Sequence, residues 1–127
     1  MKLLLDTHAF IWWDSSPQQL SVTARRALED ANNEVVVSVI SLWEIAIKQQ
    51  LGKLKLHRAL DEIVADQVHQ GLQTLDFGTA HVLQISRLPD HHKDPFDRAL
   101  IAQAMVENAT LVTKDATMSA YHIPLLW

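Results

Sequence analysis

The sequence lacks cysteine altogether and contains only three glycines and four prolines among its 127 residues. The absence of cysteine excludes disulfides, thiolate metal ligands and thiol nucleophiles, and it is compatible with a reducing cytoplasm. So few glycines and prolines leave no obvious linker, and we find no internal repeat or low-complexity segment. No apolar run approaches the roughly 20 residues of a membrane-spanning helix, and Asp6 interrupts the hydrophobic N-terminus before a signal peptide could form. We therefore expect one cytoplasmic domain over residues 1–127, with no membrane partner.

A surplus of positive charge is also absent, because the net charge is −4 and the isoelectric point is about 5.9. Domains that hold nucleic acid electrostatically are usually strongly basic, so composition alone does not predict such a partner. A polyanionic substrate would need a metal to offset acidic side chains and a few local basic residues to position it. The basic candidates are Lys48, Lys53, Lys55 and Arg58, although a solvated helix end and loop explains each of them more simply.

Short apolar runs alternate with segments of helical periodicity along the chain. The predicted strands are residues 2–6, 35–39 and 110–113, with weaker candidates at 72–75 and 121–126. The predicted helices begin at about residue 8 and then cover residues 21–31, 40–52, 58–70, 78–87 and 95–108. Strands separated by helices at this spacing indicate a three-layer α/β/α sandwich around a mostly parallel sheet of four or five strands.

Four acidic residues stand at the edges of these apolar segments: Asp6, Glu44, Asp97 and Asp115. Carboxylates are costly to bury without protons, partners or a metal. In open parallel sheets, ligands bind beyond the carboxyl ends of the strands, which is where Asp6 and Asp115 are expected. Convergent carboxylates make a hard-oxygen site suited to Mg²⁺ or Mn²⁺. We therefore predict a divalent-metal site built from these four residues.

Helix capping offers a local explanation for several of the acids. Asp6 precedes a short helical segment over residues 8–13, and Asp115 precedes another over residues 116–120. Each carboxylate can accept hydrogen bonds from the backbone N–H groups at the start of its segment. Asp94 is a plausible N-cap of the helix that starts near Pro95. Asp97, in the first turn of the same helix, gains from the positive helix N-terminus by roughly 0.3–1 kcal/mol.

Glu44 is harder to explain locally, because apolar residues surround it in a helix that is expected to be buried. Ser41 lies three residues earlier, the spacing of a capping box, and Lys48 lies four residues later, the spacing of a helical ion pair worth roughly 0.2–0.5 kcal/mol. A lone glutamate in such a helix still calls for another role.

Other metal and nucleophile chemistries have weaker support. His91 and His92 next to Asp94 raise the alternative of a zinc site, but the remaining histidines have no clear ligand spacing. Loop structure or support of a neighbouring site residue is the favoured role for His92. The sequence contains neither a glycine-rich phosphate loop nor a G-x-S-x-G nucleophile elbow.

Four segments in order, LLLDTHAFIWW, SVISLWEIAIKQQLGKLKL, LPDHHKDPFDRALIAQA and LVTKDATMSAY, resemble the PIN-domain ribonucleases, and more specifically the VapC-type toxins of bacterial toxin–antitoxin pairs. The resemblance runs from the first strand to about Tyr121, and it implies a single PIN domain. It also implies a Mg²⁺- or Mn²⁺-dependent endoribonuclease, a small cognate antitoxin protein and a tendency to form homodimers. The family's acidic quartet falls on Asp6, Glu44, Asp97 and Asp115.

The resemblance also indicates residues near the site whose roles are less defined. Asp94 matches the additional acid of the DPFDR motif, and His92 matches a histidine that is common before it. Thr7 and Thr113 match positions where a hydroxyl could orient a carboxylate or a metal-bound water.

Two rival functions use the same residues. One is a metal-dependent DNA nuclease, because the site residues alone do not read the 2′-hydroxyl. The other is a catalytically silent module that binds RNA or protein, although such a module would have no reason to keep four electrostatically costly acids. Arg98 or Lys114 could contact the phosphate of a nucleic-acid substrate, although pairing with acidic side chains at the surface is the simpler role for both residues.

Overall fold

A five-stranded sheet forms the centre of the computed structural model, which describes all of residues 1–127. The strands are β1 (Lys2–Leu5), β2 (Glu34–Ser38), β3 (Gln73–Leu75), β4 (Thr110–Val112) and β5 (Leu125–Leu126). They lie in the order β3-β2-β1-β4-β5, and every neighbouring pair is parallel. The predicted parallel sheet is thus confirmed, with the last candidate strand reduced to two residues.

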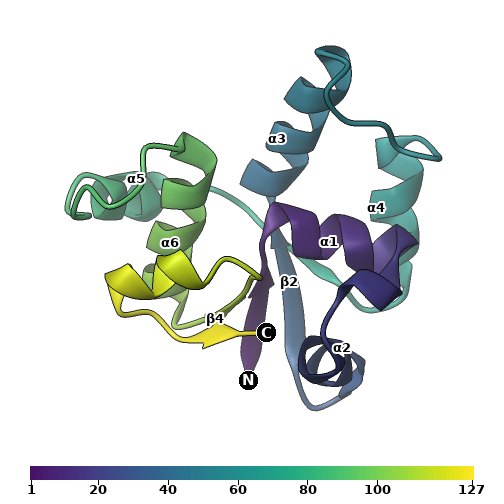
Figure 1. The fold of residues 1–127 in the computed structure, drawn as a ribbon, viewed down its shortest axis with the longest axis horizontal. Coiled ribbons are helices and arrows are strands. Elements are labelled where there is room, and N and C mark those ends of the chain that lie inside the picture. The colour runs from purple at the N-terminus through teal and green to yellow at the C-terminus, as the bar shows by residue number, and fades with distance from the viewer.

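Six α-helices and two 3₁₀ helices connect the strands (Figure 1). The α-helices are α1 (Thr7–Ser15), α2 (Val22–Glu29), α3 (Val39–Gln50), α4 (Leu60–His69), α5 (Thr79–Ile85) and α6 (Pro95–Glu107). The 3₁₀ helices are η1 (Pro17–Gln19) and η2 (Ala116–Tyr121). None of these helices combines the length and the apolar character that a bilayer crossing requires.

Strand β1 lies in the middle of the sheet and is completely buried from Leu3 to Leu5. Alternate residues of a strand point to opposite faces, so β1 contributes to two separate cores. Leu3 and Leu5 pack with Phe10 beneath the layer of α1, α2 and α4, whereas Leu4 packs with Leu100 of α6 on the other face. Figure 1 shows α1, α2 and α4 on one side of the sheet and α5 and α6 on the other. The predicted three-layer sandwich is confirmed.

The start of α3 differs from the prediction. Ser38, the last residue of β2, caps the helix by accepting a hydrogen bond from the Ile40 N–H at 3.0 Å. The chain passes from strand to helix without a loop, so the helix begins at Val39 and Ser41 lies inside its first turn. The predicted capping box between Ser41 and Glu44 is therefore wrong. Ser21, the first residue of the helix expected over residues 21–31, is the N-cap of α2 and accepts a hydrogen bond from the Ala24 N–H.

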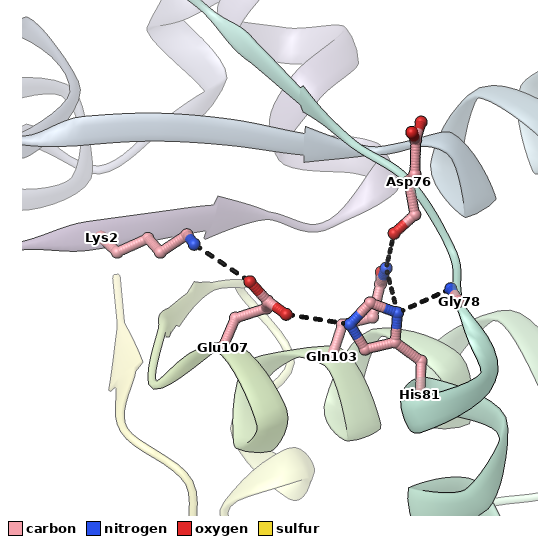
Figure 2. Close-up of polar contacts among 6 residues, drawn as sticks. All are labelled: Lys2, Asp76, Gly78, His81, Gln103 and Glu107. Carbon is pink, nitrogen blue, oxygen red and sulfur yellow. Dashed lines mark hydrogen bonds and ion pairs between the residues drawn. The ribbon is translucent and has the colours of Figure 1, made fainter.

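A polar network fastens α5 and the C-terminal end of α6 to the start of β1 (Figure 2). The buried His81 ring accepts the Gly78 N–H at Nδ1 (3.0 Å), so its Nε2–H donates to Glu107 (3.1 Å). The other oxygen of Glu107 accepts from Lys2 Nζ at 3.1 Å. Hydrogen bonds from His81 and Lys2 lower the pKa of Glu107. This network contains none of the four acids of the predicted metal site, and it orients the helix that carries one of them.

Candidate metal centre

The carboxyl ends of β1 and β4 form the point where the connections of the sheet diverge. After β1 the chain leads to β2 on one side, and after β4 it leads to β5 on the other. This is the position at which open α/β sheets bind ligands. Asp6 directly follows β1, with its N–H donating to the Val112 carbonyl at 3.0 Å, and Asp115 lies three residues beyond the end of β4. Topology thus places two of the four acids at this edge.

The negative charges of the neighbouring acids all act on the carboxylate of Asp97. Burial raises the pKa of Asp97 to about 7, and repulsion from neighbouring carboxylates adds to the increase. These carboxylates belong to Asp94, Glu44, Asp6 and Asp115. All four acids singled out in the sequence, together with Asp94, therefore lie within one another's electric field.

Asp6 is oriented by two different parts of the chain. Its carboxylate caps α1 by accepting the Ala9 N–H at 2.8 Å. Burial raises the pKa of Asp6, while hydrogen bonds from the Thr113 hydroxyl and the Ala9 N–H act in the opposite direction. The Thr113 oxygen in turn accepts the Asp115 N–H at 3.0 Å. Thr113 therefore joins two of the acids, as the resemblance to the family suggested for a hydroxyl at this position.

Glu44 is buried, with a residue exposure of 5%, and both of its oxygens have partners. Thr7 donates to one oxygen at 2.6 Å, and Lys48 Nζ lies 2.5 Å from the other. The Thr7 hydroxyl has one hydrogen, so its 3.1 Å contact with Ser41 requires the Ser41 hydroxyl to donate. The predicted pair with Lys48 is present. The partner of Glu44 that the sequence did not reveal is Thr7, and Ser41 is linked to Glu44 only through the Thr7 hydroxyl.

Lys48 is placed by this pair inside the acidic group. The hydrogen bond to Glu44 raises the pKa of Lys48, and the charges of Glu44, Asp94 and Asp97 reinforce the increase. Its ammonium group therefore supplies positive charge where the carboxylates repel one another most.

Asp115 and His92 are joined through the first turn of η2. One oxygen of Asp115 accepts both the N–H (3.0 Å) and the hydroxyl (2.5 Å) of Thr117. Because the Thr117 hydroxyl donates its hydrogen there, its oxygen accepts from His92 Nε2 at 3.0 Å. His92 Nδ1 then accepts from the Tyr121 hydroxyl at 3.3 Å. His92 thus holds the element that carries Asp115, which agrees with the supporting role expected for it.

Asp94 is the N-cap of α6, as predicted. One of its oxygens accepts the N–H groups of Phe96 (2.8 Å) and Asp97 (3.0 Å). Asp94 and His92 are therefore both engaged in holding the backbone near the acids. Neither residue is arranged with His91 as the zinc alternative requires, since no three histidine or acidic side chains of the molecule form a group that could hold a metal ion.

Two of the basic residues considered for phosphate contacts have structural roles instead. Arg98 donates to the backbone carbonyls of Pro89 (3.0 Å), His92 (3.4 Å) and Ile85 (3.4 Å), and so holds the loop before α6. Arg58 bridges Asp14 of α1, at 2.7 Å, and Asp66 of α4. Arg98 thus binds backbone carbonyls rather than surface acids, and its contact with phosphate stays a prediction.

The acidic group fits a divalent cation by two observations. Its donors are hard carboxylate and hydroxyl oxygens, and the raised pKa of Asp97 shows an excess of negative charge that a cation would relieve. The side chains alone do not enclose an ion. Mg²⁺, however, is usually held by one or two carboxylates, with water and substrate phosphate completing its shell. One or two of these carboxylates could thus hold a metal ion only together with water and a substrate phosphate.

A sizeable cavity of the molecule lies elsewhere. It has a volume of about 560 Å³ and is lined by residues such as Asn32, Glu34, Gln70 and Gln73, near the start of β2 and the end of α4. This is the amino-terminal edge of the sheet, opposite the acids. Charge and topology, rather than cavity size, therefore identify the functional site.

Comparison with known proteins identifies the family of the chain. The family model described as PIN domain matches residues 3–123. The chain is 30% identical over 123 residues to the Mycobacterium tuberculosis protein named Ribonuclease VapC22, covering 96% of this chain and 93% of that protein.

Solved structures of toxin–antitoxin complexes share the fold. VapBC2 from Rickettsia felis, bound to a promoter DNA fragment, matches with a TM-score of 0.68 and 22% identity over 98% of this chain and 97% of that chain. DNA-bound VapBC from Salmonella typhimurium matches with a TM-score of 0.69 and 18% identity over 98% of this chain and 96% of that chain.

Proposed function

Because the chain belongs to the PIN-domain family, we propose that it is a VapC-type toxin that hydrolyses RNA phosphodiester bonds with the help of Mg²⁺ or Mn²⁺. The observation that carries this proposal is the gathering of acids at the divergence point of the sheet, where burial raises the pKa of Asp97 to about 7 and repulsion from the neighbouring carboxylates adds to the increase. The relative named Ribonuclease VapC22 supports RNA as the substrate.

Asp6, Asp97 and Asp115 would be the main metal ligands, directly or through water, and Glu44 would bind a second metal or orient the attacking water. When bound, the metal would activate water and offset charge on the phosphate. Thr113 keeps the Asp6 carboxylate in its orientation, and Thr7 does the same for Glu44. These contacts preorganise the oxygens, so that little reorientation is needed when substrate arrives.

Lys48 would act with the acids on the substrate phosphate. Its ammonium lies against Glu44 and in the field of Asp94 and Asp97. A side chain with 38% exposure can turn from this position toward an incoming phosphate. Since the chain as a whole is negative, such a local cation matters more for holding RNA than the overall charge does.

The proposed partners follow from the relatives. The similar structures are of VapBC complexes, and we propose that a small antitoxin protein binds this chain as well. We further propose that the protein forms homodimers and acts in the cytoplasm. Co-expression with the product of a short neighbouring gene, followed by co-purification and light scattering, tests the partner and the oligomeric state together.

The central experiment compares Asp6→Asn and Asp97→Asn with the wild type in Mg²⁺-dependent cleavage of RNA. Removing one ligand charge is expected to reduce cleavage by at least about 100-fold, the upper range found for groups that merely support metal ligands. Asp90→Asn is the matched control, because Asp90 is an exposed loop residue near the site and should leave cleavage unchanged. Full activity of a folded Asp97→Asn variant would contradict the assignment.

Two further measurements separate the rival functions. Equal cleavage of RNA and single-stranded DNA by the wild type would favour a DNA-directed or unselective nuclease. Calorimetric titration with Mn²⁺ tests the metal independently of cleavage. RNA binding without any heat of Mn²⁺ binding would indicate the catalytically silent module.

A further inference from the structure

An aromatic pair stands directly beside two of the acids. Trp43 of α3 precedes Glu44, and Phe96 of α6 precedes Asp97. The two rings pack edge to face, with their centroids 5.5 Å apart and an angle of 76° between their planes. Phe96 is partly buried, whereas Trp43 is 59% exposed. The rim of the acidic site therefore carries an indole ring that is held by a neighbour but not covered.

The exposure of Trp43 distinguishes it from the other tryptophans. Trp12, Trp13 and Trp127 are partly buried and pack against the core under α1. An edge-to-face contact occupies at most one face of an aromatic ring, so at least one face of Trp43 is available. Exposed large apolar side chains need no role when they are scattered, but this one adjoins a residue of the proposed catalytic site.

We propose that Trp43, braced by Phe96, is the platform on which an unpaired RNA base next to the scissile phosphate stacks. The proposal rests on the proposed function and names how that substrate is held. Single-stranded RNA is commonly bound by stacking its bases on aromatic side chains. Such stacking does not depend on charge, and it suits a chain with a net charge of −4 whose site is acidic.

A base fits this surface better than a protein partner does. A protein interface usually needs a contiguous apolar patch. Exposed Pro95 directly precedes Phe96, but the two residues before it, Lys93 and Asp94, are exposed and charged. Leu51, the strongly exposed apolar residue that follows the C-terminal end of α3, lies eight residues further along, which is about 12 Å on a helix. An isolated ring in a polar rim matches the size of one base.

The test measures RNA binding by fluorescence anisotropy with a labelled, random-sequence, single-stranded RNA decamer. Ca²⁺ replaces Mg²⁺, and gels confirm that the RNA stays intact. Trp43→Ala should weaken binding by about 5- to 150-fold, the loss found when one stacking aromatic is removed. Trp43→Phe should retain most of the affinity, and Val82→Ala, which removes an exposed apolar side chain on α5, should bind as the wild type does.

An abasic decamer with the same backbone provides the decisive comparison. Wild type and Trp43→Ala should bind it equally, because there is no base to stack. The loss on intact RNA should also be similar at low and high salt, unlike the loss of a phosphate contact. Equal binding of intact RNA by wild type and Trp43→Ala would overturn the proposal, as would an equal loss on abasic RNA or no binding by the wild type. Loss of antitoxin binding or of the dimer in Trp43→Ala, with RNA affinity unchanged, would show a protein contact instead.

The binding assay and the cleavage assay fail independently. If the wild type binds the decamer through Trp43 but does not cleave RNA with any metal, the nuclease function is wrong and the base platform stands. If the wild type cleaves RNA and Trp43→Ala binds and cleaves it equally well, the platform alone is wrong.

Discussion

Replacing Asp97 by asparagine should stabilise the metal-free protein at alkaline pH. The carboxylate of Asp97 is held among other acids, and its ionised form is disfavoured in the folded state. Asparagine has nearly the same shape but no charge, so it removes the repulsion without leaving a cavity. A mutation that abolishes a proposed metal ligand is thus expected to raise the free energy of unfolding, which is the opposite of the usual effect of a substitution.

The size and sign of this effect follow from the pKa. A folded-state value of about 7 compares with an ordinary value of 3.8, and about three pH units at about 1.4 kcal/mol each amount to about 4 kcal/mol. Water around this partly exposed side chain screens the repulsion, and we therefore expect ~2 kcal/mol. The folded state binds the proton more tightly, so the contribution of Asp97 to stability is fully present below pH 3.8 and is lost as the pH rises through about 7.

Urea unfolding in EDTA at pH 4 and pH 8 measures this difference. Wild type and Asp97→Asn should have similar free energies of unfolding at pH 4, and that of the variant should be higher by ~2 kcal/mol at pH 8. Mg²⁺ at 100 times its dissociation constant should then stabilise the wild type by about 2.7 kcal/mol and the variant by less. Asp90→Asn controls for loss of one negative charge. An Asp97→Asn variant no more stable than the wild type at pH 8 in EDTA would refute the electrostatic reasoning.

Three other variants test separate parts of the structure. Thr7→Val should lower the free energy of unfolding by about 1–3 kcal/mol and reduce cleavage, because buried Glu44 loses its 2.6 Å hydrogen bond; Thr7→Ser should restore both. Lys48→Met should raise the affinity for Mn²⁺ in calorimetry by about 30-fold, the effect of removing about 2 kcal/mol of repulsion between a unit charge and a divalent ion about 4 Å apart in water; an unchanged affinity would place the ammonium away from the metal. Glu107→Gln should cost about 1–2 kcal/mol at pH 7 in urea unfolding. Because the folded-state pKa of Glu107 is lowered, this cost should disappear as the pH falls below 4.5.

The strands and helices were largely predictable because their determinants are local. An uninterrupted apolar run such as Leu3 to Leu5 can only be a strand covered on both faces, and it is completely buried. Left-handed glycines end two helices where the sequence placed the stops, with φ of +71° at Gly52 and +110° at Gly71. The predicted start of α3 was wrong because Ser38 and Ser41 are both suitable N-cap residues. Only the direct passage from β2 into the helix decides between them.

The partners of the acids could not be predicted in the same way. Capping by Asp6, Asp94 and Asp115 involves residues two or three positions away, so spacing alone indicated it. The Thr7 hydroxyl reaches Glu44 across 37 positions of sequence, and no periodicity encodes that distance. The same holds for Arg98, whose carbonyl partners exist only once the loop before α6 is folded.

By itself, the sequence determined which segments form strands and helices, and it showed that Asp6 and Asp115 follow strands whereas Glu44 and Asp97 lie within helices. It did so because backbone hydrogen bonds, side-chain periodicity and capping act over a few residues. Only the tertiary structure decided that these carboxylates share one field, that Lys48 is part of it, and that the pKa of Asp97 is about 7. The physical reason is that electrostatic repulsion depends on distance in space. That distance is fixed by β1 pairing in parallel with both β2 and β4.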